Sequence, residues 1–152
     1  MNLYLAQFKR GYAHTAVYLL RDRTDEGGNQ AFGFFRPDYS PRPAARYLHN
    51  LTSILADTAR NEAPGTLDYA ILRQPDTVHD LLLQRSDGVF QLVIWGERLR
   101  GTDKIELLLG LRPRGITLYD PTVGSEPIDR FRNRKSITLE LSDHPLIIEI
   151  RP

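Results

Sequence analysis

The residues Ala63-Pro64-Gly65 separate two different patterns of apolar residues, and this change of pattern decides the fold. Residues 1–63 have the pattern of a helix, a strand and a second helix, whereas residues 64–152 have the pattern of short antiparallel strands. We therefore expect the last α/β unit of a larger domain, followed by an antiparallel β-sandwich domain. The predicted fold class is α+β, mostly β.

The first predicted helix covers residues 2 to about 13 and ends near Gly11. Tyr4, Leu5, Phe8 and Tyr12 follow one another at a spacing of three to four residues, which places them on one face. The pattern starts at the first residues of the chain without a capping residue or a preceding strand. This layout is typical of a helix cut out of a larger domain.

Residues 15–20, Thr-Ala-Val-Tyr-Leu-Leu, form a nearly continuous apolar run, which predicts a strand buried on both faces. A polar loop at 25–29 and a short aromatic strand or extended stretch at 31–35 follow. A second helix is predicted with Ser40 as its cap and a proline in its first turn. It carries Ala44, Leu48, Leu51 and Leu55 on one face and is expected to end near Asn61. A buried strand needs neighbouring strands, which residues 1–63 do not supply. We therefore expect this segment to contact another chain, to self-associate or to repack.

After Gly65 the apolar residues tend to alternate, which predicts about seven short strands and a sandwich. The sequence Ser86-Asp87-Gly88 predicts a hairpin turn between two of them. Trp95 lies in a strand with apolar residues on both sides, which favours packing in the core. The predicted strands cover residues 67–73, 78–84, 89–95, 104–109, 115–119, 136–141 and 146–150.

Composition excludes several classes of partner and site. The formal net charge is +1, from 20 basic and 19 acidic residues, so neither a nucleic acid nor an acidic membrane is the expected partner. The absence of cysteine excludes disulfide bonds, thiolate metal ligands and cysteine nucleophiles. No apolar run approaches the roughly 20 residues of a membrane span. The first residues lack the layout of a signal peptide, and localisation is left open.

Few residues are candidates for chemistry, and we expect no catalytic residue, metal or cofactor in this chain. The sequence contains no G-x-S-x-G elbow and no glycine-rich phosphate loop. The acidic residues of 22–26 do not have the ligand spacing of a calcium loop, so a solvated loop is expected there. The histidines are isolated and lack the spacing of zinc ligands; they are His14, His49, His79 and His144.

Tyr18, Arg21 and Asp22 are the three candidates for substrate binding. They lie within or directly after the predicted strand at 15–20. In parallel α/β domains, ligand-binding residues gather at the carboxyl ends of the strands. This position, rather than a recognised motif, makes the three residues candidates.

Several segments resemble a known family. Residues 16–22 (Ala-Val-Tyr-Leu-Leu-Arg-Asp), 32–35 (Phe-Gly-Phe-Phe) and 41–45 (Pro-Arg-Pro-Ala-Ala) resemble the last β/α unit of bacterial (β/α)₈-barrel glycoside hydrolases, a group that includes cellulase-like and family 39-like enzymes. The β-sandwich that follows such barrels is similar to residues 86–95, to Tyr119-Asp120-Pro121 and to residues 143–150. The resemblance covers nearly the whole chain.

This resemblance implies that the parent enzyme hydrolyses glycosidic bonds in carbohydrate, and it implies a secreted or periplasmic parent enzyme. In the family, the acid/base and the nucleophile are glutamates at the ends of the fourth and seventh barrel strands. This chain is expected to begin in the seventh helix, so none of its residues corresponds to either glutamate. The resemblance therefore implies that the chain alone is inactive, and that its sandwich supports the barrel and borders the substrate cleft.

Two other classes of function stay open. A carbohydrate-binding module would need an exposed aromatic row on the sandwich, for which Trp95, Tyr69 and Tyr119 are the residues to examine. A non-catalytic interaction partner would complete a barrel that a separate chain supplies. Exposure of the three aromatic side chains would favour the first class, and an adjacent reading frame with the two catalytic glutamates would favour the second.

Overall fold

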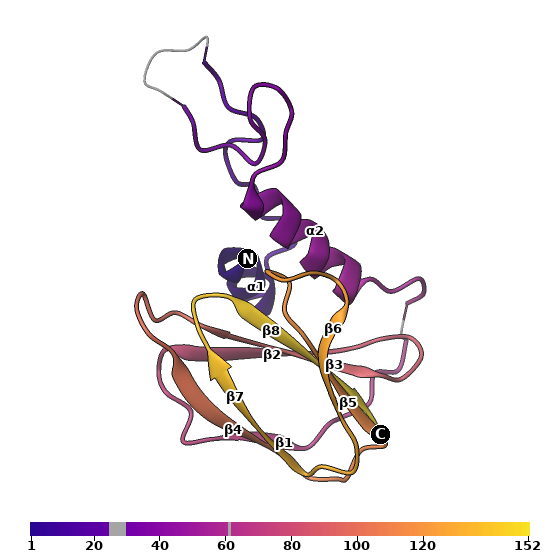
Figure 1. Cartoon of the computed structure of the whole chain (residues 1–152). Coiled ribbons are helices and arrows are strands. Elements are labelled where there is room, and N and C mark those ends of the chain that lie inside the picture. The colour runs from indigo at the N-terminus through magenta and orange to yellow at the C-terminus, as the bar shows by residue number, and fades with distance from the viewer. Residues whose placement is uncertain (25–29, 61) are drawn as a thin grey trace.

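The computed structural model describes residues 1–24, 30–60 and 62–152. In these residues it shows two helices and eight strands, and the strands form two antiparallel sheets (Figure 1). The predicted class, α+β and mostly β, is confirmed. None of the helices in the described ranges has the length and apolar character needed to cross a bilayer.

The larger sheet has five strands and the smaller sheet has three. The order of the five-stranded sheet is β2 (Val78–Gln84), β3 (Phe90–Gly96), β8 (Pro145–Arg151), β5 (Gly115–Tyr119) and β6 (Pro127–Phe131). The order of the three-stranded sheet is β1 (Tyr69–Leu72), β4 (Asp103–Leu109) and β7 (Ser136–Leu141). In β4, buried and exposed residues alternate strictly, because the outer face of the smaller sheet contacts solvent.

The molecule has two apolar layers, one on each face of the five-stranded sheet. The first fills the space between the sheets and includes Leu92, Leu107 and Ile148. The second lies between the five-stranded sheet and the helices α1 (Asn2–Lys9) and α2 (Pro43–Leu55), which pack above it in Figure 1. Every residue of β3 is buried, because both faces of this strand are covered. Trp95 is only 1% exposed, which confirms its predicted place in the core.

Both predicted helices form, but their ends differ from the prediction. Helix α1 ends at Lys9, and Gly11 has a φ of 83°, a conformation that glycine adopts without strain. Helix α2 begins with a proline, as predicted, but Arg42 occupies the N-cap position without a side-chain hydrogen bond. The prediction that Ser40 caps this helix is wrong, since Ser40 Oγ and its backbone N–H both donate to the Asp38 carboxylate.

The predicted buried strand at residues 15–20 is wrong. The segment is irregular, and Val17, Tyr18 and Leu20 are exposed. Its carbonyl groups at 19 and 20 accept hydrogen bonds from the backbone N–H groups of 34 and 35, and Arg21 forms a single parallel bridge with Phe35. Because the described residues supply no further strand beside it, the segment has no sheet to join, and the described structure shows no barrel.

The sandwich strands agree closely with the prediction. Strands β2, β5 and β7 have the predicted bounds, whereas β1 is shorter than predicted. The turn at Ser86-Asp87-Gly88 is confirmed, with Gly88 at a φ of 85°. Strand β6 was not predicted, and only isolated bridges at Phe35 mark the predicted stretch 31–35. The prediction that the second helix continues to about Asn61 is wrong, since α2 ends at Leu55, where Ala56 leaves the helical conformation with a ψ of 135°. The polar loop at 25–29 falls outside the described residues.

Candidate functional site

The three substrate-binding candidates have different surroundings. Tyr18 is 67% exposed; its hydroxyl donates to Gln30 Oε1 over 3.0 Å, and its ring lies 6.2 Å from that of Phe32. The guanidinium of Arg21 lies 4.7 Å from the centre of the Tyr39 ring, which is within cation–π range. The structure thus exposes three aromatic side chains in this part of the chain, with Phe32 beside Tyr18 and Tyr39 beside Arg21. We call these three side chains, Tyr18, Phe32 and Tyr39, the aromatic cluster.

Asp22 is buried and serves a structural role. Its Oδ1 accepts a hydrogen bond from the backbone N–H of Gly33 over 2.7 Å, and its Oδ2 accepts one from Arg42 Nη2 over 2.5 Å. The hydrogen bond from Arg42 lowers the pKa of Asp22 below its ordinary value, although burial opposes this change. A buried carboxylate with a lowered pKa is a poor proton acceptor, so Asp22 has the wrong properties for a catalytic base.

Gly33 is needed because the chain approaches Asp22 closely. A Cβ atom at position 33 would lie 2.7 Å from the backbone nitrogen of Asp22 and 2.9 Å from its Oδ1. No sequence pattern marked Gly33, Arg42, Phe32 or Tyr39 as site residues. The available signals were the stretch Phe32-Gly33-Phe34-Phe35 and the arginine between two prolines.

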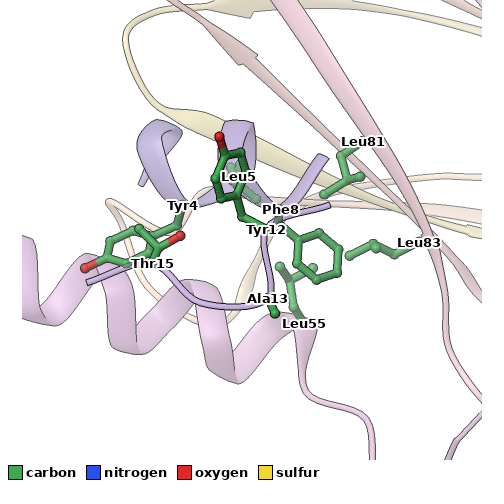
Figure 2. A pocket seen from close by; sticks show the side chains of 9 residues that line it. All are labelled: Tyr4, Leu5, Phe8, Tyr12, Ala13, Thr15, Leu55, Leu81 and Leu83. Carbon is green, nitrogen blue, oxygen red and sulfur yellow. The ribbon is translucent and has the colours of Figure 1, made fainter. Parts of the chain in front are cut away.

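A groove with apolar walls opens between the two helices and the edge of the larger sheet. Figure 2 shows its lining, with Tyr4, Leu5 and Phe8 from α1, Leu55 from the end of α2, and leucines of β2. The groove has a volume of about 310 Å³. Its further lining residues are Tyr12, Ala13, Thr15, Leu81 and Leu83.

Two more grooves flank the irregular segment at 15–20. One lies between this segment and α2, has a volume of about 450 Å³, and is lined by Val17, Leu20 and Leu48 among others. The other shares Val17 and Leu48 and extends to Met1. Tyr4 lines all three grooves, so they surround one side chain. We call the surface formed by α1, residues 15–20 and 34–35, and α2 the apolar face.

A serine, a histidine and an aspartate form a hydrogen-bonded chain between two loops. Ser142 Oγ lies 2.8 Å from His144 Nδ1, and His144 Nε2 lies 3.2 Å from Asp120 Oδ2. The order resembles a nucleophile, a base and an orienting acid. Here Asp120 Oδ1 also accepts hydrogen bonds from the backbone N–H and hydroxyl of Thr122, so the chain joins the turn after β5 to the loop before β8. His144 is isolated in the sequence, so its spacing did not predict this contact with Asp120.

The aromatic residues that a carbohydrate-binding sandwich would expose are covered. Trp95 is buried, and Tyr69 and Tyr119 are half-buried. The Tyr69 hydroxyl donates to Asp80 Oδ2 over 2.5 Å, and the Tyr119 hydroxyl donates to Glu149 Oε2 over 3.2 Å. Burial and the neighbouring carboxylate raise the pKa of both tyrosines. These three side chains do not form an exposed row on the sandwich.

In the described part of the chain, no group of three or more histidine or carboxylate side chains could hold a metal ion. Comparison of the sequence with protein-family models gives no match. Comparison with curated proteins also gives no match. The observations that bear on function are therefore the apolar face and the aromatic cluster.

Proposed function

We propose that this chain is the C-terminal part of a (β/α)₈-barrel glycoside hydrolase. In this proposal it contributes the last β/α unit and a supporting sandwich, and it contributes no catalytic glutamate. The parent enzyme hydrolyses glycosidic bonds in carbohydrate. The observation that carries the proposal is the apolar face, together with the resemblance of residues 16–22 and 41–45 to the last unit of such barrels.

Exposed apolar side chains are concentrated in the N-terminal part of the chain. Of the 13 large hydrophobic side chains exposed in the described residues, eight fall within the first 39 residues, and five of these eight belong to the apolar face: Leu3, Phe8, Val17, Tyr18 and Leu20. Burial of apolar surface contributes about 25 cal/mol per Å², so a contiguous face of this kind favours a covering partner. A preceding barrel strand beside residues 15–20, with the helices of the barrel around it, would cover this face.

The sandwich holds the N-terminal unit in place, which supports a structural role. The Asn2 side-chain amide donates to the carbonyl oxygens of Gly96 and Asp143 over 3.0 and 2.9 Å. The Asn50 side chain of α2 donates to the carbonyl of Pro121 over 2.8 Å. These links, with the apolar layer under the helices, fix both helices on the larger sheet. A barrel that used α1 and α2 as its last helices would be supported directly by this sheet.

The aromatic cluster is the surface that would contact the substrate in this proposal. Tyr18 lies near the end of the segment at 15–20, and Phe32 and Tyr39 come after it, where the carboxyl end of the last barrel strand would be in this proposal. Exposed aromatic rings next to Arg21 can pack against the apolar faces of sugar rings. The cluster offers binding rather than bond cleavage, because its neighbouring carboxylate, Asp22, is buried and paired.

Two measurements test this proposal. The DNA 5′ of the codon for Met1 is expected to encode barrel strands with the two catalytic glutamates, in the same reading frame or in an adjacent one. The purified 152-residue chain is expected to show no turnover of aryl glycosides or polysaccharides. Unrelated coding DNA upstream would contradict the proposal, and so would glycosidase turnover that is lost on substitution of a carboxylate in this chain.

A further inference from the structure

We infer that a second surface, formed by basic side chains at one end of the sandwich, binds an anionic polysaccharide. The surface consists of Arg112, Arg114, Arg132, Arg134, Lys135 and Arg151, which we call the basic end. Anion binding there is independent of the apolar face. The choice of a polysaccharide over a nucleic acid rests in part on the proposed function.

Three separate segments bring these side chains to one end of the molecule. The backbone N–H of Leu109 donates to the carbonyl of Lys135 over 2.8 Å, which places the loop after β4 beside the turn after β6. The backbone N–H of Arg114 donates to the carbonyl of Arg151 over 2.8 Å, which adds the end of β8. Figure 1 shows this C-terminus on the side of the sandwich away from α1.

The charges of the basic end are exposed and largely unpaired. All six side chains are exposed. Arg151 lies 4.0 Å from Glu149, but within the described part of the chain the other five have no carboxylate at ion-pair distance. Residues 110–119 and 130–139 contain no acidic residue. Like charges held together without partners repel one another and produce a strong local positive potential, which a bound polyanion would neutralise.

The backbone under these side chains is held in tight turns. Asn133 lies between two of the arginines with a φ of 52°, a left-handed conformation that closes the turn after β6. Pro113 is buried between the two arginines of the other loop. The arginines are therefore presented from fixed backbone positions, which lowers the entropy cost of binding an extended anion.

The composition of the basic end favours carboxylate or sulfate groups on a flexible chain. Five of the six cations are arginines, whose guanidinium groups bind planar carboxylates with two parallel hydrogen bonds. The neighbouring aromatic residue, Phe131, packs against the core and so does not offer a stacking surface for nucleic-acid bases. Outside the basic end the chain has 14 basic and 19 acidic residues, which disfavours a long, stiff duplex lying across the molecule.

The test measures binding of the 152-residue chain to fluorescent polygalacturonate, with neutral dextran and a short DNA duplex as comparison ligands. Arg132→Ala/Arg134→Ala removes two charges from the basic end. The matched control, Arg60→Ala/Arg100→Ala, removes two exposed charges elsewhere and leaves the same net charge. Thermal unfolding of both variants confirms that they are folded.

We expect polygalacturonate to bind, dextran not to bind, and binding to weaken as the salt concentration rises. Arg132→Ala/Arg134→Ala is expected to weaken binding about tenfold, and the control less than about twofold. Absence of polygalacturonate binding, equal losses in the two variants, or tighter binding of the DNA duplex would each overturn the inference. The assay requires no glycosidase activity, so its failure is distinct from failure of the proposed function.

Discussion

Gln91, the second residue of β3, donates a hydrogen bond from its side-chain amide to the carbonyl oxygen of Ile54 over 2.8 Å. Ile54 lies in the last turn of α2, where a helix leaves carbonyl groups without partners inside the helix. The same amide nitrogen lies 3.3 Å from Glu149 Oε1. One buried polar side chain therefore connects α2 to two central strands of the larger sheet.

The first prediction concerns this connection. Gln91→Leu keeps a side chain of similar size but leaves the buried carbonyl of Ile54 without its donor. We expect the free energy of unfolding to fall by about 1–3 kcal/mol, as measured by urea denaturation. Thr138→Ala, at an exposed position of β7, is the control and should change stability by less than about 0.5 kcal/mol. Equal stability of the two variants would show that the Gln91 hydrogen bond contributes nothing.

The second prediction concerns the dependence of stability on pH. Burial would raise the pKa of Asp80, but the hydrogen bond from Tyr69 and the charge of Lys9 outweigh it and lower this pKa below 3.8. The stabilisation by this hydrogen bond is therefore fully present above pH 3.8 and is lost as the pH falls through the lower, folded-state value.

Tyr69→Phe removes that hydrogen bond. We expect it to lower the free energy of unfolding by about 1–2 kcal/mol near neutral pH. The difference from the wild type should shrink as the pH falls below 3.8, in urea titrations across the acid range. Tyr12→Phe, at an exposed tyrosine, should follow the wild type throughout. A stability difference that does not change with pH would rule out the role assigned to the Asp80 carboxylate.

The third prediction concerns the close approach at Gly33. Gly33→Ala places a methyl group within 3 Å of Asp22 and so separates Asp22 from Arg42. Hydrogen exchange of residues 19–23 and 33–42 should become faster, while exchange in β3 and β8 stays unchanged. Gly124→Ala is the control, because its Cβ would have no contact closer than 3.9 Å. If the two variants exchange alike, the Asp22–Arg42 pair does not organise this region.

The fourth prediction concerns the link between the two loops. His144→Ala removes the contacts to Ser142 and Asp120, and should lower the free energy of unfolding by about 1–2 kcal/mol in urea denaturation. Asp143→Ala is the control; its side chain is 77% exposed and lies 3.5 Å from the same histidine. Stability loss in the control but not in His144→Ala would contradict the role of this histidine as a link.

Much of the sandwich could be predicted because the order of apolar and polar residues in its strands matches their buried and exposed positions. Strand β7 alternates buried and exposed residues, and β2 is bounded by clear turn residues. Strand β6 could not be predicted in the same way. It is an edge strand whose central residues, Ile128, Asp129 and Arg130, are all exposed, so no apolar alternation marks it.

The N-terminal part was harder to predict because an apolar run forms a buried strand only where neighbouring strands are present, and the described residues place no sheet strand beside this segment. Residues 15–20 are nearly all apolar, which indicates a buried strand, yet most of them lie exposed, and the segment borders a groove beside α2. The sequence places Asp22 directly after this segment. Its hydrogen bond with Arg42, which is 20 residues later, forms only because the chain folds back on itself. Sequence spacing alone does not reveal such a contact.

The fifth prediction tests the central claim that the apolar face is covered in the working protein. Hydrogen exchange in the 152-residue chain alone should be fast at residues 15–20 and slow in β3 and β8. In the presence of the polypeptide encoded directly upstream, exchange at residues 15–20 should slow at least about tenfold. The opposite result, slow exchange at these residues in an isolated monomer with no change on adding that polypeptide, would contradict the account.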